Sequence, residues 1–221
     1  MRAKRYNKNK TAYAMSRRRL NTIIVFLLLA AAVFIWLDHN PANHKLQKPV
    51  ESENRVINYD FQKYHGRIFT VANVVDGDTI DIDIPDGEKQ TTRIRLLGID
   101  TPETKHPQKG VCYFGPQAAE FTKTTSLGKQ VTVYLEKHRT RGKYGRLLAY
   151  VQLPDSKFLN EVLLSEGFAY ADLRFRHSFY QRYKQLEASA RSRSKGLWQN
   201  VTHGQLPEWL QKRKPALMQK K

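Results

Sequence analysis

The sequence contains a single cysteine, Cys112, so no disulfide can form within the chain. No cysteines and histidines stand at the spacing of a zinc site. The seven histidines are scattered without a ligand pattern, and only His106 lies near a group of acidic residues. We expect His106 to be a solvated loop residue. Disulfide-stapled folds and zinc centres are therefore excluded as ways of organising this chain.

Acidic residues are absent from residues 1–19, which carry eight lysines and arginines. Residues 201–221 carry five basic residues and one acid, although the whole chain has a net charge of +18. The middle of the chain is therefore only modestly basic, and the two ends are basic arms. A modest positive field favours a polyanionic substrate and speeds its encounter with the protein.

Charge is also absent from residues 20–37, an apolar run interrupted only by Asn21 and Thr22. As a helix this run would be about 27 Å long, just enough to cross the hydrocarbon core of a bilayer. Residues 17–19 are three arginines, and the positive-inside rule then predicts a cytoplasmic arm over residues 1–19. The rest of the chain would lie on the outer, periplasmic or extracytoplasmic, side of a single-pass membrane protein.

A cleaved signal peptide is the competing interpretation of the same run, and it would give a secreted protein. After Leu37, however, no good small-x-small cleavage site follows, and Pro41 interrupts the candidate region. We therefore predict an uncleaved transmembrane signal anchor over residues 20–37. Residues 38–65 are polar and show no sustained periodicity, so we expect a flexible linker reaching about 30 Å.

Short segments rich in valine, isoleucine and threonine begin at Arg67 and predict five strands. The predicted strands cover residues 67–75, 79–84, 91–97, 130–135 and 146–153. Helices are expected over residues 117–126, 160–166 and 178–194, the last capped by Ser178. Five strands with helices between and after them indicate a small barrel of α+β, mostly β, class over residues 66–199.

Three carboxylates and two arginines stand at the ends of these segments. Asp78, Asp100 and Glu103 provide hard oxygen ligands for a cation, and Arg95 and Arg146 can each donate two hydrogen bonds to a phosphate. Phosphodiester cleavage requires this combination, because negative charge grows on the phosphorus oxygens. Taken singly, Asp78 could be a turn-capping aspartate and Glu103 a surface glutamate.

Three motifs carry a family resemblance. DGDT at 76–79, RLLGIDTPETKHPQKG at 95–110 and KYGRLLAY at 143–150 occur in the order, and nearly at the spacing, found in the staphylococcal nuclease (thermonuclease) family. The chain resembles that family from about Arg67 to Trp198. The resemblance implies a five-stranded OB-type barrel and a calcium-dependent endonuclease in which water attacks the phosphorus in line with the leaving oxygen.

The resemblance also implies roles for individual residues. Calcium would be bound by Asp78, Asp100 and the backbone carbonyl of Thr101, and Glu103 would position or deprotonate the attacking water. Arg95 and Arg146 match the two phosphate-binding arginines, with Arg95 preferred over Arg93 on motif register alone. Lys143 and Tyr144 match the residues that contact the terminal phosphate.

The sequence departs from the family pattern in two places. The hairpin between Asp78 and Arg95 is longer, because it contains residues 85–88. Residues 168–176 lack the family's base-stacking tyrosine in its usual register, and Tyr170, Phe175 or the added arginines are the candidates to replace it. The basic tail over residues 200–221 is expected to be solvated, with contact to nucleic acid or lipid headgroups as the alternative.

Together these features predict a membrane-anchored, calcium-dependent nuclease that acts as a monomer on DNA, with RNA as a second candidate substrate. An inactive OB-type module that only binds nucleic acid, or a membrane-surface scaffold, is the alternative. The scaffold hypothesis leaves the acidic cluster unexplained. Loss of any of the three carboxylates or two arginines would have favoured a binding module, and none is lost.

Overall fold

The computed structural model describes residues 17–38, 41–104 and 110–218 and divides the chain into two compact units, residues 1–54 and 55–221. The predicted basic arm lies outside the described residues over positions 1–16, as do His106 and the last three residues of the tail. The two units are described separately below.

The first unit contains helix α1 (Arg17–Asp38), which covers the predicted apolar run. Its described apolar side chains, from Ile23 to Val33, are exposed. Leu20 and residues 34–37 also belong to the predicted span, but their side chains lie outside the described set. Among the residues that the structure describes, no helix has both the length and the apolar character needed to cross a membrane.

Helix α2 (Pro41–Tyr64) replaces most of the flexible linker predicted over residues 38–65. The correction has a physical reason in its last two turns, which belong to the second unit. Ile57, Asp60, Phe61 and Tyr64 stand at helical spacing, and all four are buried or half-buried. Because Asp60 interrupts the apolar residues of this stripe, the sequence shows no sustained helical periodicity there. The second unit therefore begins at Arg55 rather than at residue 66.

Five strands close into a barrel in the order β1, β2, β3, β6, β5. They are β1 (Arg67–Asp76), β2 (Thr79–Ile82), β3 (Thr92–Leu96), β5 (Gln130–Leu135) and β6 (Leu147–Gln152). The strands pair antiparallel except for β3 and β6, which are parallel. The predicted five-stranded barrel is confirmed. The core inside it is formed by branched side chains such as Ile80, Ile94 and Val133, which are fully buried.

Helices cover one side and one end of the barrel. α3 (Gly115–Ser126) packs against β1, and α4 (Leu159–Ser165) packs against both β6 and α5 (Tyr180–Ser192). A short pair of strands, β4 (Ile99–Asp100) and β7 (Tyr170–Ala171), lies outside the barrel sheet. The residue before α5 is Phe179, so Ser178 does not cap this helix. Instead, the Ser178 N–H donates to the carboxylate of Glu136 at 2.7 Å.

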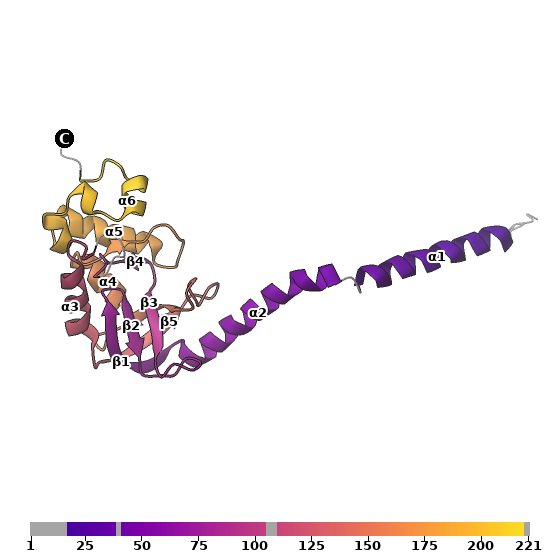
Figure 1. Ribbon diagram of the computed structural model, residues 1–221, viewed down its shortest axis with the longest axis horizontal. Coiled ribbons are helices and arrows are strands. Elements are labelled where there is room, and N and C mark those ends of the chain that lie inside the picture. Colours follow the sequence, from indigo (N-terminus) through magenta and orange to yellow (C-terminus); the bar gives the residue numbers. More distant parts are fainter. Residues whose placement is uncertain (1–16, 39–40, 105–109, 219–221) are drawn as a thin grey trace, which may run out of the picture. The chain divides into compact units, whose positions relative to one another are not determined.

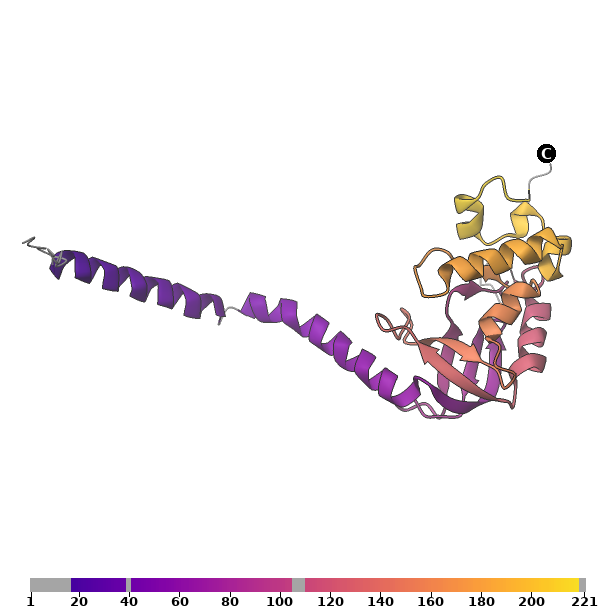
Figure 2. The same cartoon turned by 180° about the vertical axis from the view of Figure 1, so that it is seen from behind.

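The C-terminal segment packs onto the rest of the second unit, which corrects the expectation of a solvated tail. After the 3-10 helix η1 (Gly196–Gln199), the chain forms η2 (His203–Gln205) and α6 (Glu208–Arg213). Leu206 and Leu210 are each 1% exposed and belong to a buried cluster with Trp198 and Tyr170. Figures 1 and 2 show this segment, in yellow, over α5. The apolar residues of the tail are thus core residues of a second, smaller cluster.

The end of α2 is joined to the barrel by buried polar contacts. Asp60 is fully buried, accepts a hydrogen bond from Thr140 at 2.6 Å and forms an ion pair with Arg141 at 2.7 Å. Tyr64 is also fully buried, and its hydroxyl lies 3.1 Å from that of Thr92. A buried carboxylate needs such partners, because removing one would leave an unpaired charge in the interior.

We predict that Tyr64→Ala lowers the free energy of unfolding by about 3 kcal/mol, since it removes a large, fully buried ring. Tyr59→Ala is the matched control, because Tyr59 lies on the same helix and is 56% exposed; its effect should stay within about 0.5 kcal/mol. Urea unfolding followed by circular dichroism measures both. Equal small effects would show that α2 does not contribute to the stability of the second unit.

Candidate active site

Asp78 lies in the tight connection between β1 and β2 and is only 5% exposed. Its Oδ1 accepts a hydrogen bond from the Thr79 hydroxyl at 3.0 Å, and its Oδ2 accepts one from the Thr101 N–H at 3.0 Å. The preceding Gly77 leaves no room for a side chain, since a Cβ there would come within 2.7 Å of Thr101 Oγ1. The turn therefore presses Asp78 directly against the segment that carries Thr101.

Arg95 on β3 bridges Asp78 and Asp100. One guanidinium nitrogen lies 2.7 Å from Asp78 Oδ2, and the other lies 2.6 Å from Asp100 Oδ1. Arg93, two residues earlier, instead forms a two-pronged ion pair with Asp81. Because Arg93 is engaged with Asp81, the structure brings Arg95, and not Arg93, to the two carboxylates.

Asp100 ends β4, and both of its oxygens have partners. Oδ1 is bound by Arg95, and Oδ2 accepts a hydrogen bond from the indole N–H of Trp209 at 2.8 Å. Burial, to which the charge of Asp78 adds, raises the pKa of Asp100 to about 6, although Arg95 opposes this rise. A single guanidinium therefore does not compensate the buried negative charge fully.

Glu103 follows Pro102 and faces the same cluster. Burial raises the pKa of Glu103 to about 7, and a hydrogen bond with Asp76 and the charges of Asp78 and Asp100 add to this rise. Its backbone carbonyl accepts the N–H of Cys112 at 3.0 Å, which ties the loop back to the start of α3. A carboxyl group whose pKa lies near neutrality can exchange a proton during a reaction at physiological pH.

Arg146 stands at the start of β6, and its guanidinium lies 3.5 Å from the Thr79 hydroxyl. Lys143 and Tyr144 precede it in the same turn, and Tyr144 is 76% exposed. The structure thus brings the two predicted phosphate contacts and Arg146 to one exposed turn. Arg146 reaches toward the Asp78 turn through Thr79, which places this cationic turn beside the acidic cluster.

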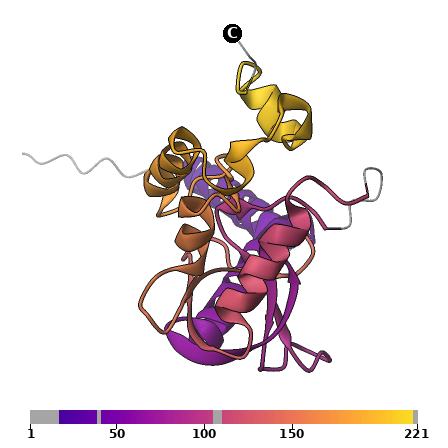
Figure 3. The ribbon, with the colours of Figure 1, turned by 90° about the vertical axis from the view of Figure 1, so that its left-hand side faces the viewer.

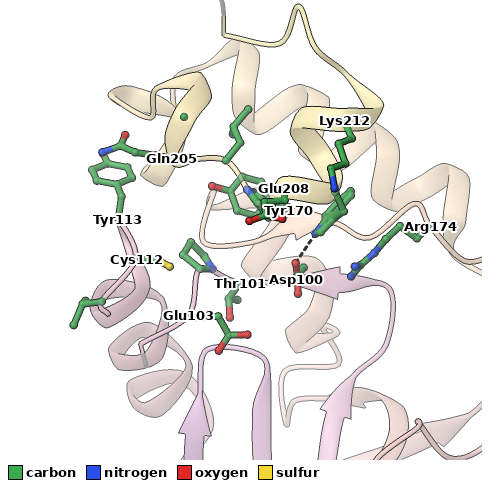
Figure 4. A pocket seen from close by; sticks show the side chains of 16 residues that line it. Asp100, Thr101, Glu103, Cys112, Tyr113, Tyr170, Arg174, Gln205, Glu208 and Lys212 are labelled. Atoms are coloured by element: carbon green, nitrogen blue, oxygen red, sulfur yellow. Dashed lines mark hydrogen bonds between the residues drawn. The ribbon is translucent and has the colours of Figure 1, made fainter. Parts of the chain in front are cut away.

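Residues of the site line two neighbouring hollows, and Arg174 lines both. The first, of about 770 Å³, is lined by Asp100, Thr101, Glu103 and the C-terminal segment. The second, of about 850 Å³, is lined by Arg95, Lys143, Tyr144 and Arg146. Figure 4 shows Asp100, Thr101 and Glu103 together in the first hollow, with the hydrogen bond to Asp100 drawn as a dashed line. The predicted acidic groups and the predicted cationic groups therefore face different, neighbouring spaces.

The donor set near Asp78 consists of oxygen atoms, which suits a hard divalent cation. Thr101 Oγ1 is buried there and makes no hydrogen bond to any described residue. Within the described part of the chain, no three side chains of His, Cys, Asp or Glu converge in a metal-binding arrangement. The residues fit a site of two carboxylates completed by a threonine oxygen and waters, and do not fit a site enclosed by protein ligands.

Comparison with known proteins settles the family. The family model described as staphylococcal nuclease homologue matches residues 93–200. The chain is 38% identical over 133 residues to a thermonuclease of Staphylococcus hyicus, a match that covers 60% of this chain and 76% of the relative. This chain belongs to the staphylococcal nuclease family.

Two further relatives agree with this assignment. A thermonuclease of Staphylococcus intermedius is 37% identical over 135 residues, which is 61% of this chain and 77% of the relative. An endonuclease of Escherichia coli O157:H7 is 31% identical over 153 residues, which is 66% of this chain and 83% of the relative. The protein is a nuclease, a phosphodiesterase that acts on nucleic acid, and not merely a binding module of the same fold.

Sequence reasoning missed three residues at the site of this nuclease. Asp76 stands in the DGDT motif, which gives it no role of its own in the predicted site, but its side chain forms a hydrogen bond with Glu103. Thr122 on α3 is fully buried and donates to the carbonyl of Gly77 at 2.6 Å. Trp209 lies in the tail that the sequence predicts to be solvated. Only Asp76 carried a local signal, its place beside Asp78.

The exposure of the candidate residues shows which of them could replace the family's base-stacking tyrosine. Tyr170 is 1% exposed and packs edge-on against Trp198, so the nuclease cannot offer this ring to a base. Phe175 is 58% exposed and lines the larger hollow beside the cationic turn. Arg174 lies over the Phe175 ring at 5.8 Å, whereas Arg176 lies over Tyr180. Of the candidates, Phe175 presents an exposed aromatic face.

We predict that Glu103→Gln raises the melting temperature of the metal-free nuclease at pH 8 by a few degrees, and by less at pH 5. The pKa of Glu103 is raised from an ordinary value of 4.5 to about 7 in the folded protein. The stability that the protonated form provides is complete below the ordinary value and is lost as the pH rises through about 7. A neutral glutamine does not lose it.

Thermal unfolding followed by circular dichroism at pH 5, 6, 7 and 8 checks this prediction. Glu120→Gln on α3 is the control, because Glu120 is an exposed glutamate, and its offset from the wild type should not change with pH. An offset for Glu103→Gln that is equal at pH 5 and pH 8 would contradict the raised pKa.

Proposed function

We propose that this nuclease is calcium-dependent and hydrolyses phosphodiester bonds through the cluster of Asp78, Asp100, Thr101 and Glu103. The observation that carries the proposal is the bridging of Asp78 and Asp100 by one guanidinium, which leaves an acidic cluster undercompensated. Asp78, Asp100 and a Thr101 oxygen would hold the cation. Bound there, calcium would supply positive charge beside the scissile phosphate.

The remaining groups divide the reaction between them. Glu103, with a pKa near 7, would accept a proton from the attacking water or hold that water in line with the leaving oxygen. Arg95 and Arg146 would donate hydrogen bonds to the phosphate oxygens as negative charge accumulates on phosphorus. Arg95 would have to exchange part of its bonding with Asp78 and Asp100 for the phosphate, which couples cation binding to substrate binding.

The larger hollow would take the adjoining nucleotide. Lys143 and Tyr144 would contact its terminal phosphate, and the exposed ring of Phe175 would stack on the base. Stacking on a phenylalanine does not distinguish bases and needs an unpaired strand. We therefore propose single-stranded nucleic acid, DNA before RNA, as the preferred substrate.

We predict calcium activation with a midpoint of about 10⁻⁴–10⁻³ M, because a site with few charged protein ligands binds calcium loosely. Magnesium should activate weakly, since it demands a tighter octahedral arrangement. Asp78→Ala and Asp100→Ala should lose the activation, and Glu103→Gln should reduce turnover by about 10²–10⁴-fold with little change in substrate binding. Hydrolysis of single-stranded DNA, duplex DNA and RNA is measured across a calcium titration.

A chelated control and Glu120→Gln, at an exposed position on α3, complete the experiment. Full activity in excess chelator, or an unchanged calcium response in both aspartate variants, would remove these residues from the metal site. A Glu103→Gln variant that binds DNA poorly but turns it over normally would show that the role given to Glu103 is wrong.

We also propose that residues 20–37 anchor the nuclease in a membrane, with the N-terminus cytoplasmic and the nuclease unit on the outer side. The support is the uncharged apolar run, the three arginines before it and the helix α1 that covers it. A loose calcium site is consistent with this placement, because it would be empty at cytosolic calcium concentrations and filled outside the cell.

The anchor predicts that the mature protein keeps residues 20–37. Mass spectrometry of the protein extracted from membranes measures its N-terminus, and alkaline carbonate washing should leave the protein in the membrane fraction. Replacement of Leu27 and Leu28 by arginine should release it. A mature N-terminus between residues 38 and 44, with the nuclease in the medium, would overturn the anchor in favour of a cleaved signal peptide.

A further inference from the structure

The C-terminal segment holds one side chain against the acidic cluster. The hydroxyl of Thr202 and the amide of Gln205 form a reciprocal capping box around η2. Leu206 and Leu210 then fix α6 in the buried cluster. Trp209, which stands between these two leucines, is therefore carried on a packed segment rather than on a free tail. It lines the smaller hollow together with Asp100.

Trp209 makes two contacts that fix its ring. Its indole N–H donates to Asp100 Oδ2 at 2.8 Å. The guanidinium of Arg174 lies over its ring at 4.7 Å, and Arg174 is held in turn by two hydrogen bonds of 2.8 Å from its guanidinium to Asp172. An indole N–H can only donate a hydrogen bond, and an ionised carboxylate can only accept one, so the two groups are complementary.

The two candidate metal-binding aspartates differ in how they are held. Asp78 accepts hydrogen bonds from Thr79 and from the backbone of Thr101, in addition to its ion pair with Arg95. Asp100 stands at the end of a two-residue strand, and among the described residues its carboxylate is bound by Arg95 and Trp209. If Arg95 turns toward a phosphate, Trp209 is the described side chain that still fixes the Asp100 carboxylate.

We infer that Trp209 is a positioning residue for Asp100, and that the C-terminal segment completes the active site by carrying it there. This inference rests on the proposed function, in which Asp100 binds the cation. Hydrogen-bonding partners of metal ligands typically change metal affinity by about 10–100-fold when they are lost. The indole N–H would act through Asp100 and would not touch the reacting phosphate.

The test compares two tryptophans of the same cluster. Trp209→Phe keeps an aromatic ring under Arg174 and removes the N–H. Trp198→Phe makes the same chemical change at a ring that also has an arginine, Arg191, over its face. The indole N–H of Trp198 is buried and has no hydrogen-bond partner among the described residues, so its loss should not affect Asp100.

Calcium affinity is measured in the absence of substrate, from the rise in melting temperature of the full chain with calcium concentration. We expect Trp209→Phe to raise the calcium dissociation constant about tenfold and Trp198→Phe to leave it within twofold, although Trp198→Phe lowers the melting temperature more. At saturating calcium, the KM for DNA of Trp209→Phe should stay within about twofold of the wild type.

The inference is overturned if Trp209→Phe keeps the wild-type calcium affinity, or if both tryptophan variants weaken it equally. Should Trp209→Phe fail to fold, Trp209→His takes its place, and its ring N–H should retain part of the affinity, whereas Trp209→Leu should not. Asp100→Ala separates the two hypotheses. If Asp100→Ala binds calcium normally, the proposed metal site fails; if it loses calcium while Trp209→Phe does not, only the inference fails.

Discussion

Electrostatic repulsion between carboxylates pressed together at one end of the barrel is the constraint on which the rest of this structure depends. Asp76, Asp78, Asp100 and Glu103 come from a turn, a strand end and a loop, and one guanidinium, that of Arg95, lies among them. Burial raises the pKa values of Asp100 and Glu103 toward neutrality, and the charges of the neighbouring carboxylates add to this rise. The fold keeps this arrangement because two of its parts are fixed from outside the cluster. Thr122 on α3 donates to the carbonyl of Gly77 in the barrel turn, and β4 pairs with β7. Binding of a cation at such a place can recover the stability that the buried acidic groups cost.

The end of α2 and the hairpin at residues 85–88 meet on one arginine. Arg141 forms ion pairs with Asp60 on α2 at 2.7 Å and with Asp86 in the hairpin at 2.5 Å. Its position is two residues before Lys143 and five before Arg146, in the exposed turn that faces the larger hollow. Through Arg141, α2 and the hairpin therefore fix the start of the cationic turn, although neither contacts the acidic cluster in the described part of the chain. Supporting contacts of this kind hold the lysine, tyrosine and arginine of the turn in the geometry needed to bind a phosphate.

Local sequence patterns were sufficient where one strand or turn determines the outcome. The five strands followed from their β-branched residues and turns, and the cluster of Asp78, Arg95, Asp100 and Glu103 followed from motif spacing. The rest depended on tertiary partners that no local pattern shows. The helical stripe ending at Tyr64 contains Asp60, whose burial is tolerated only because Thr140 and Arg141, some 80 residues away, bind it. Asp81 alternates with isoleucines in β2, a pattern typical of a solvent-exposed face, but it is only 5% exposed because Arg93 and Asn73 bind its carboxylate. Trp209 needed both the folding-back of the tail and a carboxylate 109 positions earlier.

The two hollows carry opposite charge, and this difference determines where a nucleic-acid strand can bind. The smaller hollow has carboxylates on its wall, and the larger one has Lys143 and Arg146, while Arg174 lines both. A nucleic-acid strand carries a phosphate for every base, so it is attracted to the cationic hollow and repelled by the acidic one. Without a cation, the phosphate would be held on the cationic side, away from Glu103, and hydrolysis would be slow even with substrate bound. A cation bound at the acidic cluster would reduce this electrostatic repulsion. It would also weaken the ion pairs of Arg95 with Asp78 and Asp100, so that Arg95 could bind the phosphate. If the nuclease is calcium-dependent as proposed, the acidic cluster would keep the substrate phosphate away until a bound cation neutralises it.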